Sequence, residues 1–380
     1  MSPQTTHWIA GFRSAVISPY ERIKLTEPHE FADQTLRQVL HLAGGGEQIR
    51  VHLTNRYGRT PLVVGAARVA LRKNADQIVP ETDRALRFDG AERVTVPAGG
   101  ELISDPIDLT VEADDDLLLS LYLPEPTGLA TFSHMPTEIA YVAAGDHTAA
   151  TEVPEAQVIP ARFFVSGVDV LAPAETEIAV AFGDSWFEGF GSTIGANRRS
   201  VDVLNERVSR GWVVNQGIGG NRLLTDEIGQ RGMDRFERDA RDVPGARHVI
   251  VHFGINDLIL GGLGDQPPAT ATELIEGFTE LARRAHDAGL SIHVGTIGPY
   301  AGCVYEGPTV FETLDTRREV NEWLRGTDIF DSVFDVDRAV ADPERPDYIR
   351  PEFDSGDGMH LNDAGARAMA EAVDLAAIFG

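Results

Sequence analysis

The feature that most constrains the fold is a change in the pattern of apolar and polar residues near residue 177. Beyond this point short apolar runs alternate with polar segments that are long enough for helices. The apolar runs lie at 177–182, 211–216, 247–253 and 290–298. Such alternation is typical of a parallel sheet whose two faces are covered by helices. We therefore expect an α/β domain over residues 171–380, with its functional residues at the carboxyl ends of the strands.

The clearest helical segment in this half is 271–289. Its residues Leu274, Phe278 and Leu281 are spaced by four and three positions, which places them on one helix face. A further short strand is expected at 332–336. Asn362 stands at the start of the last helical segment, where an N-cap is expected.

Residues 1–170 have a different pattern, in which apolar and alternating runs are separated by Gly, Pro, Asn and Asp. These runs lie at 48–58, 61–71, 93–104 and 116–126. Short strands at close spacing, with few helical patterns between them, predict a β-sandwich or jelly roll. The boundary between the two domains is expected in the segment 170–177, and two domains suit a chain of 380 residues.

Four short motifs stand where a predicted strand ends or where the last helix begins. They are GDSW at 183–186, GIGGN at 217–221, GIND at 254–257 and DGMH at 357–360. Each motif alone is also compatible with an ordinary turn. Because the carboxyl ends of parallel strands meet at one edge of a sheet, the motifs together are expected to form one site.

Together the motifs contain the groups that ester cleavage by a serine requires. These are a nucleophile, a base, a group that orients the base, and donors for the developing oxyanion. Ser185 supplies the hydroxyl, His360 is the candidate base, and Asp357 lies on the same loop to orient it. The backbone N–H groups of Ser185 and Gly220 and the side-chain amide of Asn256 are the candidate oxyanion donors. Glycine at position 220 would let the backbone approach the substrate closely.

In this order the motifs resemble those of the SGNH (GDSL-type) hydrolase superfamily over residues 177–380. The first block matches with the serine as nucleophile, the second with its glycine, the third with its asparagine, and the last with its Asp and His. The resemblance implies a flavodoxin-like three-layer α/β/α domain. Trp186 departs from the family pattern, in which leucine is usual, and is expected to alter packing near the site. The N-terminal half, through residues 31–58, is similar to the β-rich domain that precedes this catalytic domain in some bacterial members.

An α/β-hydrolase is the nearest alternative fold, and the motif spacing argues against it. That fold presents its serine in a G-x-S-x-G elbow. Here Phe187 occupies the position of the second glycine. The candidate acid, Asp357, also precedes His360 by three residues on one loop, rather than following a separate strand.

We therefore expect a serine hydrolase that cleaves carboxylic esters through an acyl-enzyme, with no cofactor and no metal. The expected substrates are small-molecule or carbohydrate esters, with short-chain or acetyl groups. The superfamily also contains lipases, so a lipase or an acyltransferase with the same triad stays open. A different class also stays open, a carbohydrate-binding protein whose hydrolase domain is a non-catalytic scaffold.

Charge and composition exclude several other classes of function. A formal net charge of −26 opposes binding to nucleic acid and to anionic lipid. No apolar run approaches the roughly 18 residues of a membrane span. Cys303 is the single cysteine, which excludes an intrachain disulfide and a cysteine metal cluster. The start of the sequence lacks the basic and apolar regions of a signal peptide, so a cytoplasmic location is expected, and secretion stays open as the alternative.

Overall fold

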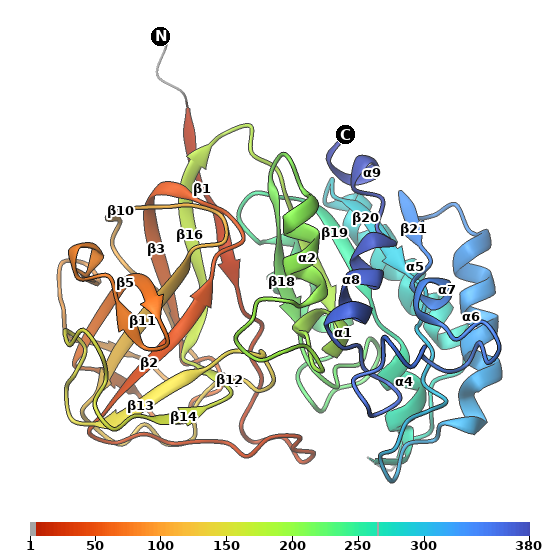
Figure 1. The fold of residues 1–380 in the computed structure, drawn as a ribbon, viewed down its shortest axis with the longest axis horizontal. Helices are drawn as coiled ribbons and strands as arrows, with labels where there is room; N and C mark the ends of the chain where they lie inside the picture. Colours follow the sequence, from red (N-terminus) through yellow and green to blue (C-terminus); the bar gives the residue numbers. More distant parts are fainter. Residues whose placement is uncertain (1–4, 264–265) are drawn as a thin grey trace. The chain divides into compact units, whose positions relative to one another are not determined.

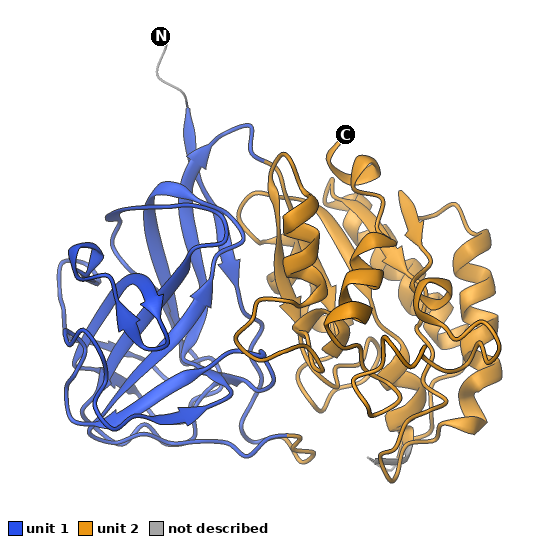
Figure 2. Cartoon of the chain, viewed as in Figure 1, with its two compact units in different colours: residues 1–20, 26–176 blue, residues 21–25, 177–380 orange. Residues whose placement is uncertain are grey.

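The structure, a computed structural model, describes residues 5–263 and 266–380 (Figure 1). The chain divides into two compact units, unit 1 with residues 1–20 and 26–176, and unit 2 with residues 21–25 and 177–380 (Figure 2). In this division the main part of unit 1 ends at Thr176, and residue 170 lies inside one of its strands. The assignment of 21–25 to unit 2 has no counterpart in the sequence pattern.

Unit 1 is a β-rich unit, as predicted, with antiparallel strands in two main sheets. The strands of these sheets are β1 (Thr6–Arg13), β2 (Gln34–His41), β3 (Gly46–Thr54), β5 (Ala66–Asn74), β6 (Gln77–Ile78), β7 (Arg84–Ala85), β9 (Glu101–Ile103), β10 (Ile107–Val111), β11 (Asp116–Leu123), β13 (Ala140–Ala144), β14 (Gln157–Ile159) and β16 (Val165–Pro173). One sheet has the order β1-β16-β3-β10 with β9 beside β3, and the other has β14-β13-β2-β11-β5-β6 with β7 beside β5. Two small ribbons pair β4 (Leu62–Val64) with β8 (Val94–Val96) and β12 (Phe132–Ser133) with β15 (Arg162–Phe163).

The larger sheet of unit 1 is held by apolar side chains on both faces of β11. Register places Leu118 opposite Val39 of β2 and Ala70 of β5, and these three side chains share one buried cluster. Leu117 and Leu119 point to the opposite face and are also fully buried. A strand that is buried on both faces reads as a continuous apolar run, which explains the sequence LLLSLYL.

Two predicted runs of unit 1 are each divided into two strands. The run 61–71 divides at Gly65 into β4, which pairs with β8, and β5, which pairs with β11. A methyl group there would come within 2.8 Å of the Tyr122 ring. The run 93–104 breaks at a turn in which Gly99 has a φ of 74°, a value that favours glycine.

The described residues of unit 2 form one parallel sheet. Its strands are β17 (Ile178–Gly183), β18 (Trp212–Gly217), β19 (Ala246–His252), β20 (Ser291–Gly295) and β21 (Ser332–Phe334). Among the described residues their order is β18-β17-β19-β20-β21, so the chain first adds a strand on one side of β17 and then continues on the other. In open α/β sheets ligands bind at the carboxyl ends of the strands where this reversal occurs. The topology therefore points to the end of β17.

Helices connect these strands. They are α1 (Ser185–Glu188), α2 (Ser200–Arg207), α3 (Gly232–Phe236), α4 (Ile255–Ile259), α5 (Ala271–Asp287), α6 (Leu314–Gly326), α7 (Val336–Val340), α8 (Asp363–Glu371) and α9 (Leu375–Phe379). Helix α2 packs against α8, and α5 packs against α6 (Figure 1). Helix α5 also packs against α3. Within the described part of the chain, none of the helices has the length and apolar character that crossing a bilayer requires.

The predicted helix at 271–289 is confirmed as α5. Thr270 caps its start in a reciprocal pair with Glu273. Leu274, Phe278 and Leu281 are fully buried on its inner face, as their spacing predicts. The N-cap of α8 is likewise confirmed, because the Asn362 side chain accepts the backbone N–H groups of Ala364 and Gly365.

Candidate active site

Ser185 lies at the point where β17 ends and α1 begins. Every residue of β17 is buried, and the strand stops at Gly183. A methyl group at this glycine would lie 2.4 Å from the carbonyl oxygen of His252, so only glycine fits. Asp184 then caps α1, since its carboxylate accepts the backbone N–H of Trp186 at 3.1 Å. The sequence thus ends a buried strand and starts a helix within two residues, which leaves Ser185 at the sheet edge.

The structure brings Ser185, His360 and Asp357 into one hydrogen-bonded chain. The Oγ of Ser185 lies 2.9 Å from Nε2 of His360. On the other side of the ring, Nδ1 of His360 lies 2.6 Å from Oδ2 of Asp357. A carboxylate can only accept, so Nδ1 carries the proton and Nε2 is free to accept the serine proton. This geometry is that of a nucleophile, its base and the group that orients the base.

The loop that carries Asp357 and His360 is fixed by its own backbone. Oδ1 of Asp357 accepts the N–H groups of Met359 and His360 at 3.0 and 2.9 Å. Burial raises the pKa of Asp357, but the hydrogen bonds from the His360 ring and from these two N–H groups outweigh burial and hold the pKa well below its usual range. The carboxylate is therefore ionised throughout the pH range of ordinary enzymes and stabilises a positive charge on the imidazole.

The predicted oxyanion donors follow the two strands that flank β17. Gly220 comes shortly after β18 and has a φ of 76°, a conformation that favours glycine. Asn256 lies in α4, directly after β19, and is buried. Its Nδ2 donates to the carbonyl oxygen of Asn221 at 3.0 Å, which links the two loops and uses one of the two amide protons. The second amide proton is the one available to a ligand.

Asp257 fixes the loop that follows Gly220. Its two carboxylate oxygens each accept one backbone N–H, from Leu223 and Leu224, at 2.9 Å. Complete burial raises the pKa of Asp257 to about 6, although these two hydrogen bonds act to lower it. Asp257, the acid of the GIND motif, therefore braces the neighbouring loop.

Two residues that no motif indicated support the same loops. Glu188, at the end of α1, is buried, and its carboxylate accepts the backbone N–H of Gly219, the residue before Gly220. Arg235 of α3 is fully buried and donates to the carbonyl oxygens of Gly183 at 2.7 Å and Gln216 at 2.9 Å. It thereby holds the ends of β17 and β18 at a fixed separation. Neither Glu188 nor Arg235 lies in a recognisable sequence motif. Only the burial of their charged side chains reveals their roles.

The aromatic residues after the serine divide between core and site. Trp186 and Phe187 are buried, so they belong to the core. Phe190 is partly exposed, and its ring packs edge to face on His360 with a centroid distance of 4.5 Å. Of these three aromatic side chains, Phe190 is therefore the one that borders the candidate base.

The segment 21–25 reaches the Gly220 loop within unit 2. A methyl group at Gly220 would lie 2.7 Å from Cγ2 of Ile228 and 2.9 Å from Cδ1 of Leu25. Glu21 accepts the backbone N–H of Ile228 at 3.1 Å, and Glu227 accepts the Arg22 backbone N–H at 2.9 Å. Residues 227 and 228 have φ values of 79° and 57°, which are rare for side chains of these types. The hydrogen bonds from 21–25 hold this strained pair in place.

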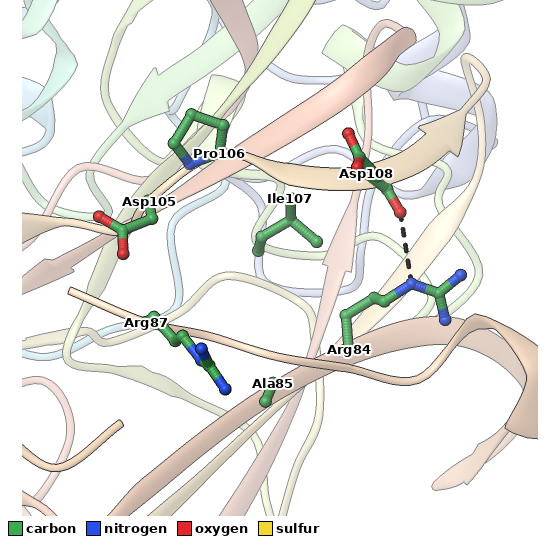
Figure 3. A pocket seen from close by; sticks show the side chains of 7 residues that line it. All are labelled: Arg84, Ala85, Arg87, Asp105, Pro106, Ile107 and Asp108. Atoms are coloured by element: carbon green, nitrogen blue, oxygen red, sulfur yellow. Dashed lines mark hydrogen bonds between the residues drawn. The ribbon is translucent and has the colours of Figure 1, made fainter. Parts of the chain in front are cut away.

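Unit 1 carries a surface cavity of about 310 Å³. It is lined by Arg84, Ala85, Arg87, Asp105, Pro106, Ile107 and Asp108 (Figure 3). Its charged groups already have partners, since Arg84 donates to the carbonyl oxygen of Asp108, Arg87 pairs with Glu92, and Asp105 accepts two backbone N–H groups. With no aromatic side chain in its lining, the cavity does not favour the carbohydrate-binding alternative.

In the part of the chain that the structure describes, no group of three or more His, Cys, Asp or Glu side chains is arranged to hold a metal ion.

A comparison with family models bears on the second half of the chain. Residues 181–368 match the model of the GDSL-like lipase/acylhydrolase family. A search of curated proteins found no match. Among solved structures, the chain is similar to a GDSL-like lipase from Bacteroides thetaiotaomicron, with 14% identity, a TM-score of 0.42, and coverage of 53% of this chain and 88% of that one.

Two further solved structures are carbohydrate esterases. One is a carbohydrate acetylesterase from Sinorhizobium meliloti, with 17% identity, a TM-score of 0.43, and coverage of 54% of this chain and 100% of that one. The other is a carbohydrate esterase family 2 enzyme with a carbohydrate-binding domain from Corynascus thermopiles. It has 11% identity and a TM-score of 0.42, and the match covers 99% of each chain.

Proposed function

Residues 181–368 belong to the GDSL-like lipase/acylhydrolase family, which confirms the relationship that the motif order predicts, and from this premise we propose that the protein hydrolyses carboxylic esters through a covalent acyl-enzyme. The observation that carries the proposal is the hydrogen-bonded chain from the Ser185 hydroxyl through His360 to Asp357.

In the first half-reaction Oγ of Ser185 attacks the ester carbonyl carbon while Nε2 of His360 takes the hydroxyl proton. The C–O bond to the alcohol then breaks, and His360 returns the proton to the leaving alkoxide. In the second half-reaction His360 takes a proton from water, which attacks the carbonyl carbon of the acyl group on Ser185. The bond from this carbon to Oγ of Ser185 then breaks, the acid is released, and His360 returns the proton to Oγ. Asp357 keeps Nδ1 protonated and stabilises the imidazolium that forms in both halves.

The negative oxygen of each tetrahedral intermediate is held by three donors. We assign this role to the backbone N–H groups of Ser185 and Gly220 and to the free amide proton of Asn256. The supports for these donors argue for the assignment. Glu188 fixes the peptide before Gly220, and the carbonyl oxygen of Asn221 orients the Asn256 amide.

The proposed substrates carry short acyl groups, with acetyl esters, including those on carbohydrates, as the first choice. Bulky side chains stand on two sides of the site and support this choice. Phe190 packs on the His360 ring, and Leu25 and Ile228 cover Gly220. Such neighbours limit the space beside the reacting carbonyl, which favours small groups over long chains.

We also infer the finer fold classes that the sequence predicted. The strand order of unit 2 supports a flavodoxin-like three-layer α/β/α arrangement. The two antiparallel sheets of unit 1, with a strand buried on both faces, support a sandwich or jelly roll.

The test is the initial rate on p-nitrophenyl esters from acetate to palmitate, together with labelling by a fluorophosphonate probe. Ser185→Ala is expected to lose both turnover and labelling. Ser209→Ala changes an exposed serine of the same unit and is the matched control. It should retain both. Turnover that persists in Ser185→Ala would refute the proposal, and a preference for palmitate would refute the short acyl group.

A further inference from the structure

Tyr305 makes a hydrogen bond to the carboxylate that orients the candidate base. Its hydroxyl donates to Oδ2 of Asp357 at 2.9 Å. This is the oxygen that also accepts Nδ1 of His360 at 2.6 Å. Oδ1 of the same carboxylate accepts two backbone N–H groups. Tyr305 is thus the fourth donor to a carboxylate that has about four acceptor positions.

The segment around Tyr305 is fixed against the loop of Asp357 by backbone contacts. The N–H of Val304 donates to the carbonyl oxygen of Asp357 at 3.0 Å. Gly302 and Gly358 touch so closely that a methyl group at 358 would lie 1.9 Å from the carbonyl oxygen of Gly302. The tyrosine is 47% exposed, so little other packing holds its side chain. Its position therefore follows from the contact between the two loops and from the hydrogen bond itself.

We propose that Tyr305 is a positioning residue of the ester hydrolase. Its hydroxyl holds the Asp357 carboxylate toward His360 and weakens the attraction of this carboxylate for the proton on Nδ1 of His360. This inference rests on the proposed function of the site. A second donor on Oδ2 spreads the negative charge, so the carboxylate favours the imidazolium less strongly.

The other groups near Asp357 and His360 do not have the effect that we propose for the Tyr305 hydroxyl. Burial and the Asp357 charge raise the pKa of Tyr305 to about 12, so its hydroxyl stays protonated and can donate. Burial also raises the pKa of the Cys303 thiol, which therefore stays neutral beside Asp357. Asp354, on the same loop, accepts the N–H groups of Gly356 and Gly358. From the side of α1, the ring is faced by the uncharged Ser185 and Phe190.

The test compares Tyr305→Phe, which removes only the hydroxyl, with wild type and with Tyr305→Ala. The kinetic parameters kcat and KM are measured on p-nitrophenyl acetate from pH 5 to 9. In Tyr305→Phe we expect kcat to fall by about three- to tenfold, with KM unchanged, since one hydrogen bond to a charged group is lost. The pH at which kcat/KM falls to half should rise by about 0.5 unit. Tyr348→Phe, a tyrosine whose ring is stacked by Arg345, is the control and should match wild type.

A measurement without substrate separates this inference from the proposed function. The proton on Nδ1 of His360, hydrogen-bonded to a carboxylate, is expected to give a far-downfield ¹H NMR signal that His360→Ala abolishes. Tyr305→Phe should move this signal, and Tyr348→Phe should not. An unmoved signal, or an unchanged pH profile in Tyr305→Phe, would overturn the positioning role. A higher KM with wild-type kcat would also overturn it, because the tyrosine would then bind substrate. Turnover that survives in Ser185→Ala would instead refute the proposed function.

Discussion

The indole Nε1 of Trp186 donates a hydrogen bond to the backbone carbonyl oxygen of Met359, at 3.1 Å. Trp186 follows the candidate nucleophile in the chain, and Met359 precedes the candidate base. The bond therefore ties the helix that carries Ser185 to the loop that carries His360. The same ring fills the space beside Gly298, where a methyl group would lie 2.2 Å from the indole. A leucine, usual at this position in the family, has no N–H with which to make the bond.

Trp186→Phe is expected to weaken both stability and catalysis. The variant leaves the Met359 carbonyl oxygen without this donor and creates space in the core, which should cost about 2 kcal/mol of unfolding free energy. Because the base is then less well placed, kcat on p-nitrophenyl acetate should fall by about tenfold. Urea unfolding and steady-state kinetics measure the two effects. Trp323→Phe, in α6, serves as control. Equal losses of unfolding free energy and of kcat in both variants would show that the Trp186 hydrogen bond does not hold the His360 loop in place.

Asn256→Asp should lower kcat by about 10² to 10³ with a small change in KM. The aspartate keeps the size of the side chain but replaces the amide donor by a carboxylate, which repels the developing oxyanion. Asn256→Ala should show a similar loss, since it also removes the donor. Steady-state rates on p-nitrophenyl acetate provide the measurement. Wild-type kcat in either variant would remove Asn256 from the oxyanion site.

Leu25→Ala should shift the preference of the enzyme toward longer acyl chains. Leu25 is 47% exposed and touches the Gly220 loop, so its truncation opens space beside the reacting carbonyl at little cost in stability. The ratio of kcat/KM for octanoate to that for acetate is expected to rise severalfold. Ile103→Ala removes an apolar side chain of similar exposure, 49%, from unit 1 and should keep the wild-type ratio. The idea fails if both variants give the same ratio.

His293 should make the fold sensitive to acid. Burial, together with the neighbouring His248, lowers its pKa to about 4 in the folded state, against an ordinary value of 6.5. The unfolded chain therefore binds a proton between these values while the folded chain does not. As pH falls from 6.5 to 4, wild type should lose up to about 3 kcal/mol relative to His293→Asn, and above pH 6.5 the difference should stay constant. Urea unfolding at pH 7.5, 5.5 and 4.5 checks this. Parallel stability curves would show that His293 does not titrate in this way.

The strands of unit 2, its helix α5 and the start of α8 were predictable because they depend on local pattern. The spacing of Leu274, Phe278 and Leu281 defines one helix face whatever the helix packs against. In unit 1 the same reasoning merged β4 with β5, although β4 pairs with β8 and β5 pairs with β11. The spacing of apolar residues and the composition contain no information on which distant strands pair.

The motifs predicted which strand ends carry Ser185, Gly220 and Asn256, and the structure places these residues at the carboxyl ends of neighbouring strands. Their catalytic roles stay predictions. Tyr305 escaped the motif search because it lies 52 residues before Asp357 in a loop with no recognisable pattern. Glu188 was also missed, since a glutamate in a helix usually faces solvent and only its burial against Gly219 distinguishes it.

The separation of residues 21–25 from the rest of unit 2 has a consequence for how such proteins can recombine. A gene fragment that begins at residue 177 would encode the whole parallel sheet but not the partners of Glu227 and Ile228. Transplanted onto another N-terminal region, it would have to hold the left-handed backbone at these positions without them. The two parts of the gene are therefore expected to be inherited together, because exchange of the segment for residues 1–176 alone would also remove residues 21–25 of unit 2.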